Sequence, residues 1–182
     1  MITSLTNPLQ KLALGVASAI ATFSTDSTPP IQTTANVGAG NGYMTCATTA
    51  GILAGDILAL EGANTSANGP WVSVVLGAIT ATNINVSVPG ARTSVTGAVL
   101  NRFERIETRY RAKKVVLTNS TTGDVFMWDT TLRDNQAYKT SGGVTTTISN
   151  GISNRSNCIG IHPNLLPVNC SFTLQCDYDY HG

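Results

Sequence analysis

The feature that most constrains the fold of this chain is a strict alternation of apolar and polar residues near its C-terminus. Successive side chains of a β-strand point to opposite faces, so a period of two predicts a strand with one buried and one exposed face. The apolar positions are Cys170, Phe172, Leu174, Cys176, Tyr178 and Tyr180, and the polar positions are Ser171, Thr173, Gln175, Asp177, Asp179 and His181. We therefore expect a half-exposed antiparallel strand here.

Shorter runs of the same character recur along the chain from about residue 31. Strands are predicted at residues 56–60, 71–75, 84–88, 115–117 and 125–128, and turns at residues 62–70, 89–90, 119–124, 142–143 and 150–151. The turn at 119–124 is expected to close a hairpin. The composition agrees, since the chain holds 26 threonines, 14 serines and 15 asparagines, which favour strands and turns. Short strands at this spacing predict an all-β fold, an antiparallel sandwich or barrel.

The N-terminal segment has a different period. Asn7 can cap a helix, Pro8 fits the first helical position and Gln10 completes a capping box. Apolar residues then follow at spacings of three and four, which predicts one amphipathic helix; they are Leu5, Leu9, Leu12, Val16, Ile20 and Phe23. This stripe can pack on the chain's own sheet or dock on a neighbouring subunit, and both interpretations stay open. At twelve residues, the apolar stretch 12–23 is too short to span a bilayer, and we expect a product without a cleaved signal.

A charged run divides the rest of the chain. It holds six of the eleven basic residues, namely Arg102, Arg105, Arg109, Arg111, Lys113 and Lys114, interrupted by Glu104 and Glu107. Mixed charge of this kind is typical of a solvated sheet edge, of a protein contact or of nucleic-acid binding, and nucleic acid is the least favoured. We expect an N-terminal helix and arm (1–30), a first β lobe (31–101), a charged connecting strand (102–112) and a second β lobe (113–182).

Groups able to perform catalysis are scarce. The chain has two histidines and ten carboxylates, and no nucleophile elbow, phosphate loop, zinc-protease or dinucleotide motif occurs. The four cysteines lack a C-x-x-C pair, so buried reduced thiols are favoured over a zinc site or a disulfide. Asp177, Asp179 and His181 share one strand face but are spaced too widely to converge on an ion without a bulge. We expect no enzyme, cofactor, metal or small-molecule substrate.

Two phrases resemble those of a known class of proteins. Ala54-Gly55-Asp56-Ile57-Leu58-Ala59-Leu60-Glu61-Gly62 and Val115-Val116-Leu117-Thr118-Asn119-Ser120-Thr121-Thr122-Gly123-Asp124 resemble segments of small β-rich virion proteins of tailed bacteriophages. The resemblance covers residues 40–182 in style and transfers no functional residue. It implies a capsid decoration or cement protein, or a component of the tail or neck.

The expected function is therefore structural. Only 12% of the residues are charged and the net charge is +1, which suits dense packing beside other proteins and gives little steering toward nucleic acid or membrane. We expect a homo-oligomeric decoration protein, made in the host cytoplasm, that stabilises a phage head by bridging subunits of the major capsid protein or other virion proteins. The candidate contacts are Leu9, Leu12, Val16, Ile20 and Phe23 in the arm and the six basic residues of the charged run. The alternative is a tail, neck or fibre component that binds a receptor or glycan, with Trp71, Trp128, Tyr138 and Tyr178 as exposed stacking platforms.

Overall fold

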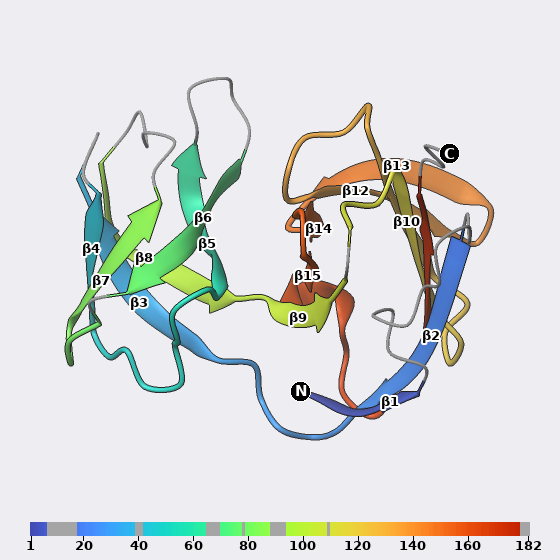
Figure 1. Ribbon diagram of the computed structural model, residues 1–182, viewed down its shortest axis with the longest axis horizontal. Coiled ribbons are helices and arrows are strands. Elements are labelled where there is room, and N and C mark those ends of the chain that lie inside the picture. The colour runs from blue at the N-terminus through green and yellow to red at the C-terminus, as the bar shows by residue number, and fades with distance from the viewer. Residues whose placement is uncertain are drawn as a thin grey trace. The chain divides into compact units, whose positions relative to one another are not determined.

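The computed structural model describes residues 1–6, 18–38, 42–64, 70–77, 79–87, 94–108 and 110–178 (Figure 1). The chain is all-β, as predicted, and its strands pair antiparallel. It divides into two compact units. The barrel unit is Pro30–Phe103, and the sheet unit combines Met1–Pro29 with Glu104–Gly182. None of the helices in the described ranges is long and apolar enough to cross a membrane.

The barrel unit is a closed six-stranded barrel. Its strands are β3 (Gln32–Val37), β4 (Tyr43–Cys46), β5 (Ile57–Asn64), β6 (Pro70–Gly77), β7 (Asn83–Ser87) and β8 (Val95–Arg102), in the order β3-β4-β7-β6-β5-β8. Inward side chains such as Met44, Trp71 and Ile84 fill the barrel. The two ends of the unit meet, because the Arg102 amide donates a hydrogen bond to the Ile31 carbonyl at 3.1 Å. Adjacent ends are what allow one domain to be inserted into another.

The sheet unit is a ten-stranded sheet curled around its own core. The N-terminal part contributes β1 (Ile2–Thr6) and β2 (Ser18–Thr25). The remaining strands are β9 (Glu104–Glu107), β10 (Lys114–Asn119), β11 (Val125–Asp129), β12 (Gln136–Ser141), β13 (Val144–Ser149), β14 (Ile152–Asn154), β15 (Cys158–Ile161) and β16 (Ser171–Asp177), with one 3₁₀ turn, η2 (Pro163–Leu165). The order is β1-β2-β16-β10-β11-β12-β14-β15-β9, and β13 pairs with β12. The core includes Phe23, Val115, Trp128 and Phe172.

Two sequence predictions in this unit are confirmed in detail. Along β16, Phe172, Leu174 and Cys176 are buried while the residues between them are partly exposed, which is the predicted alternation. The predicted hairpin at 119–124 joins β10 to β11. There the Asn119 side-chain oxygen accepts hydrogen bonds from the amides of Thr121 (2.9 Å) and Thr122 (3.1 Å), which closes the turn.

The predicted N-terminal helix is not observed. Its last residues, 18–23, belong to β2, and residues 7–17 lie outside the described part of the chain. In β2, Ala19, Ala21 and Phe23 point into the core and Ile20 points outward. The helical interpretation was based on the large apolar residues and ignored the two alanines. Together with Phe23, Ala19 and Ala21 form an apolar pattern with a period of two, which is typical of a strand. Pairing of β2 with β16 through seven residue pairs decides between the two periods.

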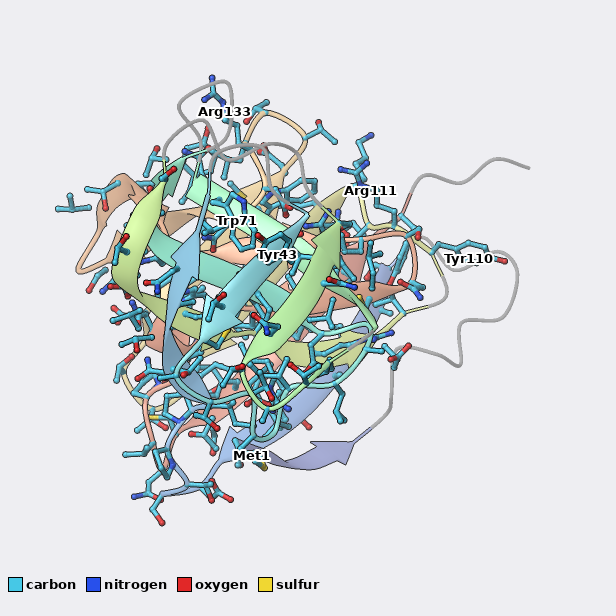
Figure 2. The ribbon with its side chains drawn as sticks, turned by 90° about the vertical axis from the view of Figure 1, so that its left-hand side faces the viewer. Met1, Tyr43, Trp71, Tyr110, Arg111 and Arg133 are labelled. Atoms are coloured by element: carbon cyan, nitrogen blue, oxygen red, sulfur yellow. The ribbon has the colours of Figure 1, made fainter. Side chains whose placement is uncertain are left out.

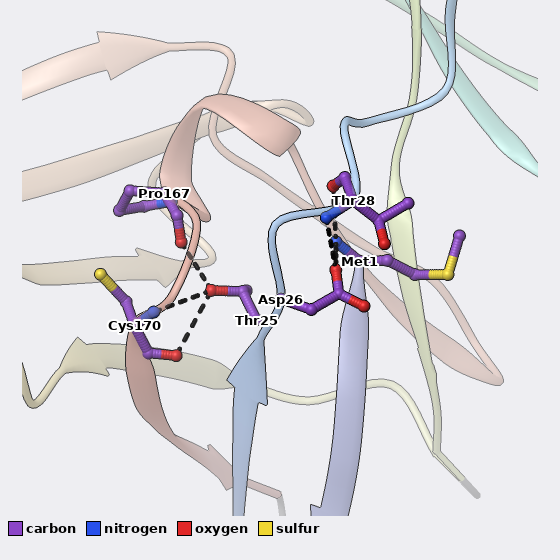
Figure 3. A network of polar contacts seen from close by, with 6 residues as sticks. All are labelled: Met1, Thr25, Asp26, Thr28, Pro167 and Cys170. Atoms are coloured by element: carbon purple, nitrogen blue, oxygen red, sulfur yellow. Dashed lines mark hydrogen bonds and ion pairs between the residues drawn. The ribbon is translucent and has the colours of Figure 1, made fainter.

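The end of β2 is fixed to the segment that precedes β16 (Figure 3). The Thr25 hydroxyl donates to the Pro167 carbonyl at 2.6 Å and accepts from the Cys170 amide at 3.1 Å. Beyond it the Asp26 carboxylate accepts from the Thr28 amide at 2.9 Å, and this hydrogen bond holds the pKa of Asp26 below its usual value. The two Thr25 contacts connect residues 142 and 145 positions apart, so the N-terminal strands are integral to the sheet unit.

Candidate functional site

The outer face of the sheet unit is an extended regular surface that crosses six strands. Residues that pair directly across antiparallel strands point to the same side. The registers of β2, β16, β10, β11, β12 and β13 therefore define rows of side chains that cross the sheet. The residues between these rows, such as Val115, Trp128 and Cys176, are buried, so the rows lie on the side away from the core.

Three rows make up this outer face. The charged row is Ser18, Asp177, Lys114 and Asp129. The apolar row is Ile20, Gln175, Val116, Met127, Tyr138 and Thr147. The threonine row is Thr22, Thr173, Thr118, Val125, Thr140 and Thr145. With about 4.8 Å between strands and about 6.8 Å between successive residues on one face of a strand, the sixteen residues of the three rows cover on the order of 500 Å².

The charged row opens into a shallow cleft of about 560 Å³, lined by Ser18, Lys113, Lys114, Asp129, Thr130, Thr131, Asp177 and Tyr178. Hydrogen bonds from the Thr131 side chain and amide are the main cause that lowers the pKa of Asp129, and the Lys114 charge adds to it. Burial raises the pKa of the Tyr178 phenol. The lowered pKa keeps the Asp129 carboxylate charged at neutral pH, and with Lys113, Lys114 and Asp177 beside it the cleft suits a polar partner of mixed charge.

Among the described residues, the histidine and the cysteines lie away from this cleft and are buried. His162 is fully buried, caps η2 by accepting from the Asn164 amide at 3.2 Å, and has a pKa lowered by burial to about 4. The four cysteines are buried free thiols, and burial raises the pKa of Cys46 to about 11 and that of Cys176 to about 12. Among the described residues no three His, Cys, Asp or Glu side chains gather as a metal site would require.

The predicted contact residues of the N-terminal arm separate in the structure. Ile20 is 54% exposed and belongs to the apolar row of the outer face. Phe23 is buried and stacks on Phe172 with 5.2 Å between the ring centroids, so its side chain serves the core. The other three, Leu9, Leu12 and Val16, lie outside the described residues.

The charged run, expected as one connecting strand, is divided between the two units. Arg102 ends β8 in the barrel unit, where its guanidinium lies 3.9 Å from the Asp56 carboxylate and donates to the Gly51 carbonyl. Arg105 is on β9 of the sheet unit and pairs with Glu107 at 2.8 Å.

Of the other basic residues of the run, two reach the outer face. Arg111 lies over the ring of Trp128, 6.0 Å from its centroid. Lys113 and Lys114 line the cleft. Arg109 lies outside the described residues. The structure therefore brings Ile20, Lys113 and Lys114 to one face and leaves Arg102 and Arg105 away from it.

The aromatic residues are distributed differently from the glycan-binding alternative. Trp71 and Trp128 are 0% and 3% exposed and cannot serve as stacking platforms, because both fill cores. Tyr138 and Tyr178 are half-buried. The exposed aromatic residue of the barrel unit is Tyr43, on β4 (Figure 2). It was not among the residues predicted from the sequence, although the alternation along Tyr43–Cys46 indicates that Tyr43 points outward when Met44 points inward.

No protein-family model, curated protein or solved structure matches this chain.

Proposed function

We propose that this chain is a structural protein of a tailed-phage virion, of the capsid decoration or cement type, that contacts neighbouring capsid subunits through the outer face of its sheet unit. The observation that carries the proposal is the outer face itself, where an apolar row and a threonine row cross the sheet beside a single charged row. The resemblance to small β-rich virion proteins supports the same role.

The size of the outer face fits such a role. A stable contact buries about 800 Å² per partner, and the rows supply on the order of 500 Å² before flanking loops are counted. With about half of that area apolar, burial contributes about 6 kcal/mol at 25 cal/mol per Å² before association costs. A single contact of this size is weak, and repetition over a shell multiplies its effect through avidity.

Copy number tests the proposal most directly. Quantitative mass spectrometry of gradient-purified particles should find hundreds of copies per particle for a decoration protein. A small multiple of three or six would instead favour a tail, neck or fibre position. Absence from particles would refute the virion role.

A matched pair of variants tests the contact face. Ile20→Asp places a charge in the apolar row, and Leu53→Asp places the same charge at a similarly exposed residue of the barrel unit, where Leu53 is 64% exposed and Ile20 is 54% exposed. We expect Ile20→Asp to reduce incorporation into particles and Leu53→Asp to leave it unchanged. Equal effects of the two variants would argue against the outer face as the contact.

One observation favours the second candidate, a glycan-binding tail or fibre component. Tyr43 is 53% exposed and pairs across strands with Asn85, beside the Thr45 hydroxyl that donates to the Asn83 side chain at 3.0 Å. An exposed ring next to amide and hydroxyl groups suits a sugar, which stacks and hydrogen-bonds at once. Glycan-array binding that is lost in Tyr43→Ala would support this role, and a blank array would leave the decoration role favoured.

A further inference from the structure

Strand β13 forms an open edge of the sheet unit. It pairs with β12 through six consecutive residue pairs, from Gln136 opposite Ser149 to Ser141 opposite Val144. The described residues place no strand on its other side. Five of its six residues are exposed, and Val144 is 66% exposed. Figure 1 shows β12 and β13 as one orange hairpin.

The turn of this hairpin determines which backbone groups face outward. Gly142 and Gly143 have φ values of 55° and 82°, as a two-residue type I′ turn requires. The residues that flank such a turn, Ser141 and Val144, form a hydrogen-bonded pair, and such pairs alternate along the ladder. The amide and carbonyl groups of Thr145, Thr147 and Ser149 therefore point away from β12, toward the open edge.

This edge lacks the devices that usually protect one. Natural edge strands carry charges, prolines or bulges, or are very short. One end of the sheet order, β9, follows this rule, because it has four residues, three of which are Glu104, Arg105 and Glu107. In contrast, β13 reads Val-Thr-Thr-Thr-Ile-Ser, without charge or proline, and it pairs with β12 without a bulge.

The sequence of β13 is also complementary to itself. In an antiparallel pair of two β13 strands centred on Thr146, Val144 lies opposite Ile148, and Thr145 lies opposite Thr147. Apolar residues thus meet apolar residues and threonines meet threonines, the combinations that favour cross-strand pairing. Thr145 and Thr147 are also two of the residues whose backbone groups face the open edge, so this register satisfies them.

We infer that two copies of this chain associate through their β13 strands, in an antiparallel two-fold pair centred on Thr146. The pairing has the isologous symmetry of a closed dimer and joins the two sheets into one. The threonine row then continues past Thr145 into the apolar row of the second copy at Thr147. The inference depends on the geometry and the sequence of this edge and stands whether or not the chain belongs to a virion.

Sedimentation of the full chain tests the dimer. The wild type should sediment as a dimer at micromolar concentrations. Thr146→Lys sets two like charges opposite each other at the two-fold axis and should weaken dimerisation by about tenfold or more. Thr96→Lys is the matched control, because Thr96 is an exposed strand threonine of the closed barrel, which has no open edge. A monomeric wild type, or a dimer equally stable in both variants, would overturn the inference.

A second variant tests the register. Opposed residues at a position without hydrogen bonds have Cβ atoms about 4.5–5.5 Å apart, close to the distance that a disulfide needs. Thr146→Cys, oxidised with copper–phenanthroline, should form a covalent dimer on non-reducing gels, whereas Thr96→Cys should not. The native cysteines are buried and should not cross-link. A dimer in which Thr146→Cys cross-links no better than Thr96→Cys would refute the proposed pairing.

Discussion

Acid should destabilise the sheet unit in part through the protonation of one buried residue, His162. Its side chain is fully buried, and burial lowers its pKa from 6.5 to about 4. Between these values the unfolded chain binds a proton that the folded chain does not, so the free energy of unfolding falls as the pH falls. The contribution is fully present above pH 6.5 and is lost progressively down to about pH 4. Linkage gives a loss of about 2 kcal/mol at pH 5 and about 3 kcal/mol at pH 4.

The variant His162→Asn isolates this effect from the titration of carboxylates. Asparagine keeps a side-chain acceptor for the Asn164 amide and is a good capping residue, but it does not titrate. Because asparagine is smaller than histidine, the variant loses some stability through poorer packing. This loss is the same at every pH, so it cancels when the pH dependence of the free energy of unfolding is compared between the two proteins. His181→Asn, at the other histidine of the chain, is the matched control.

The assay uses the fact that each unit holds one tryptophan, Trp71 in the barrel unit and Trp128 in the sheet unit. In a Trp71→Phe background, urea unfolding followed by fluorescence reports on the sheet unit alone. The stability difference between the parent and His162→Asn should shrink by about 2 kcal/mol from pH 7.5 to pH 5. A difference constant to about 0.5 kcal/mol over this range would refute the reasoning, as would an equal shift in His181→Asn.

Three further outcomes follow from the fold. The fragment Pro30–Phe103, a closed barrel with its own core, should fold alone and show cooperative unfolding by tryptophan fluorescence. If the fragment shows no cooperative transition, the barrel needs the sheet unit in order to fold. Gly151→Ala would place a Cβ against the backbone of Gln136 and should cost about 2–3 kcal/mol in urea unfolding. Gly123→Ala, at a position with open surroundings, should cost about 1 kcal/mol, and equal costs for the two variants would contradict the close approach at Gly151. Native protein should react slowly with a thiol reagent at pH 8, because its cysteines are buried and the pKa of Cys46 is raised to about 11; fast reaction of all four thiols before unfolding would show otherwise.

Part of the candidate site could be predicted from the sequence. The alternation around Phe172 predicted β16, and the residues on its polar side, including Gln175 and Asp177, lie on the outer face. Lys113 and Lys114 were selected for their charge and do line the cleft. The rows themselves were not predictable, because a row depends on the register between strands that are distant in sequence.

The sequence by itself determined six of the sixteen described strands, β5, β6, β7, β10, β11 and β16, and the turns at 119–124 and 142–143, since alternation and turn residues act over a few neighbours. Only the tertiary structure decided that residues 18–25 form a strand, because burial of Ala19 and Ala21 beside β16 outweighs the helical spacing of larger residues. It also decided that the charged run is split between two units and that β13 is left with an open edge. These features depend on which strands pair, and pairing is set by packing across the whole chain.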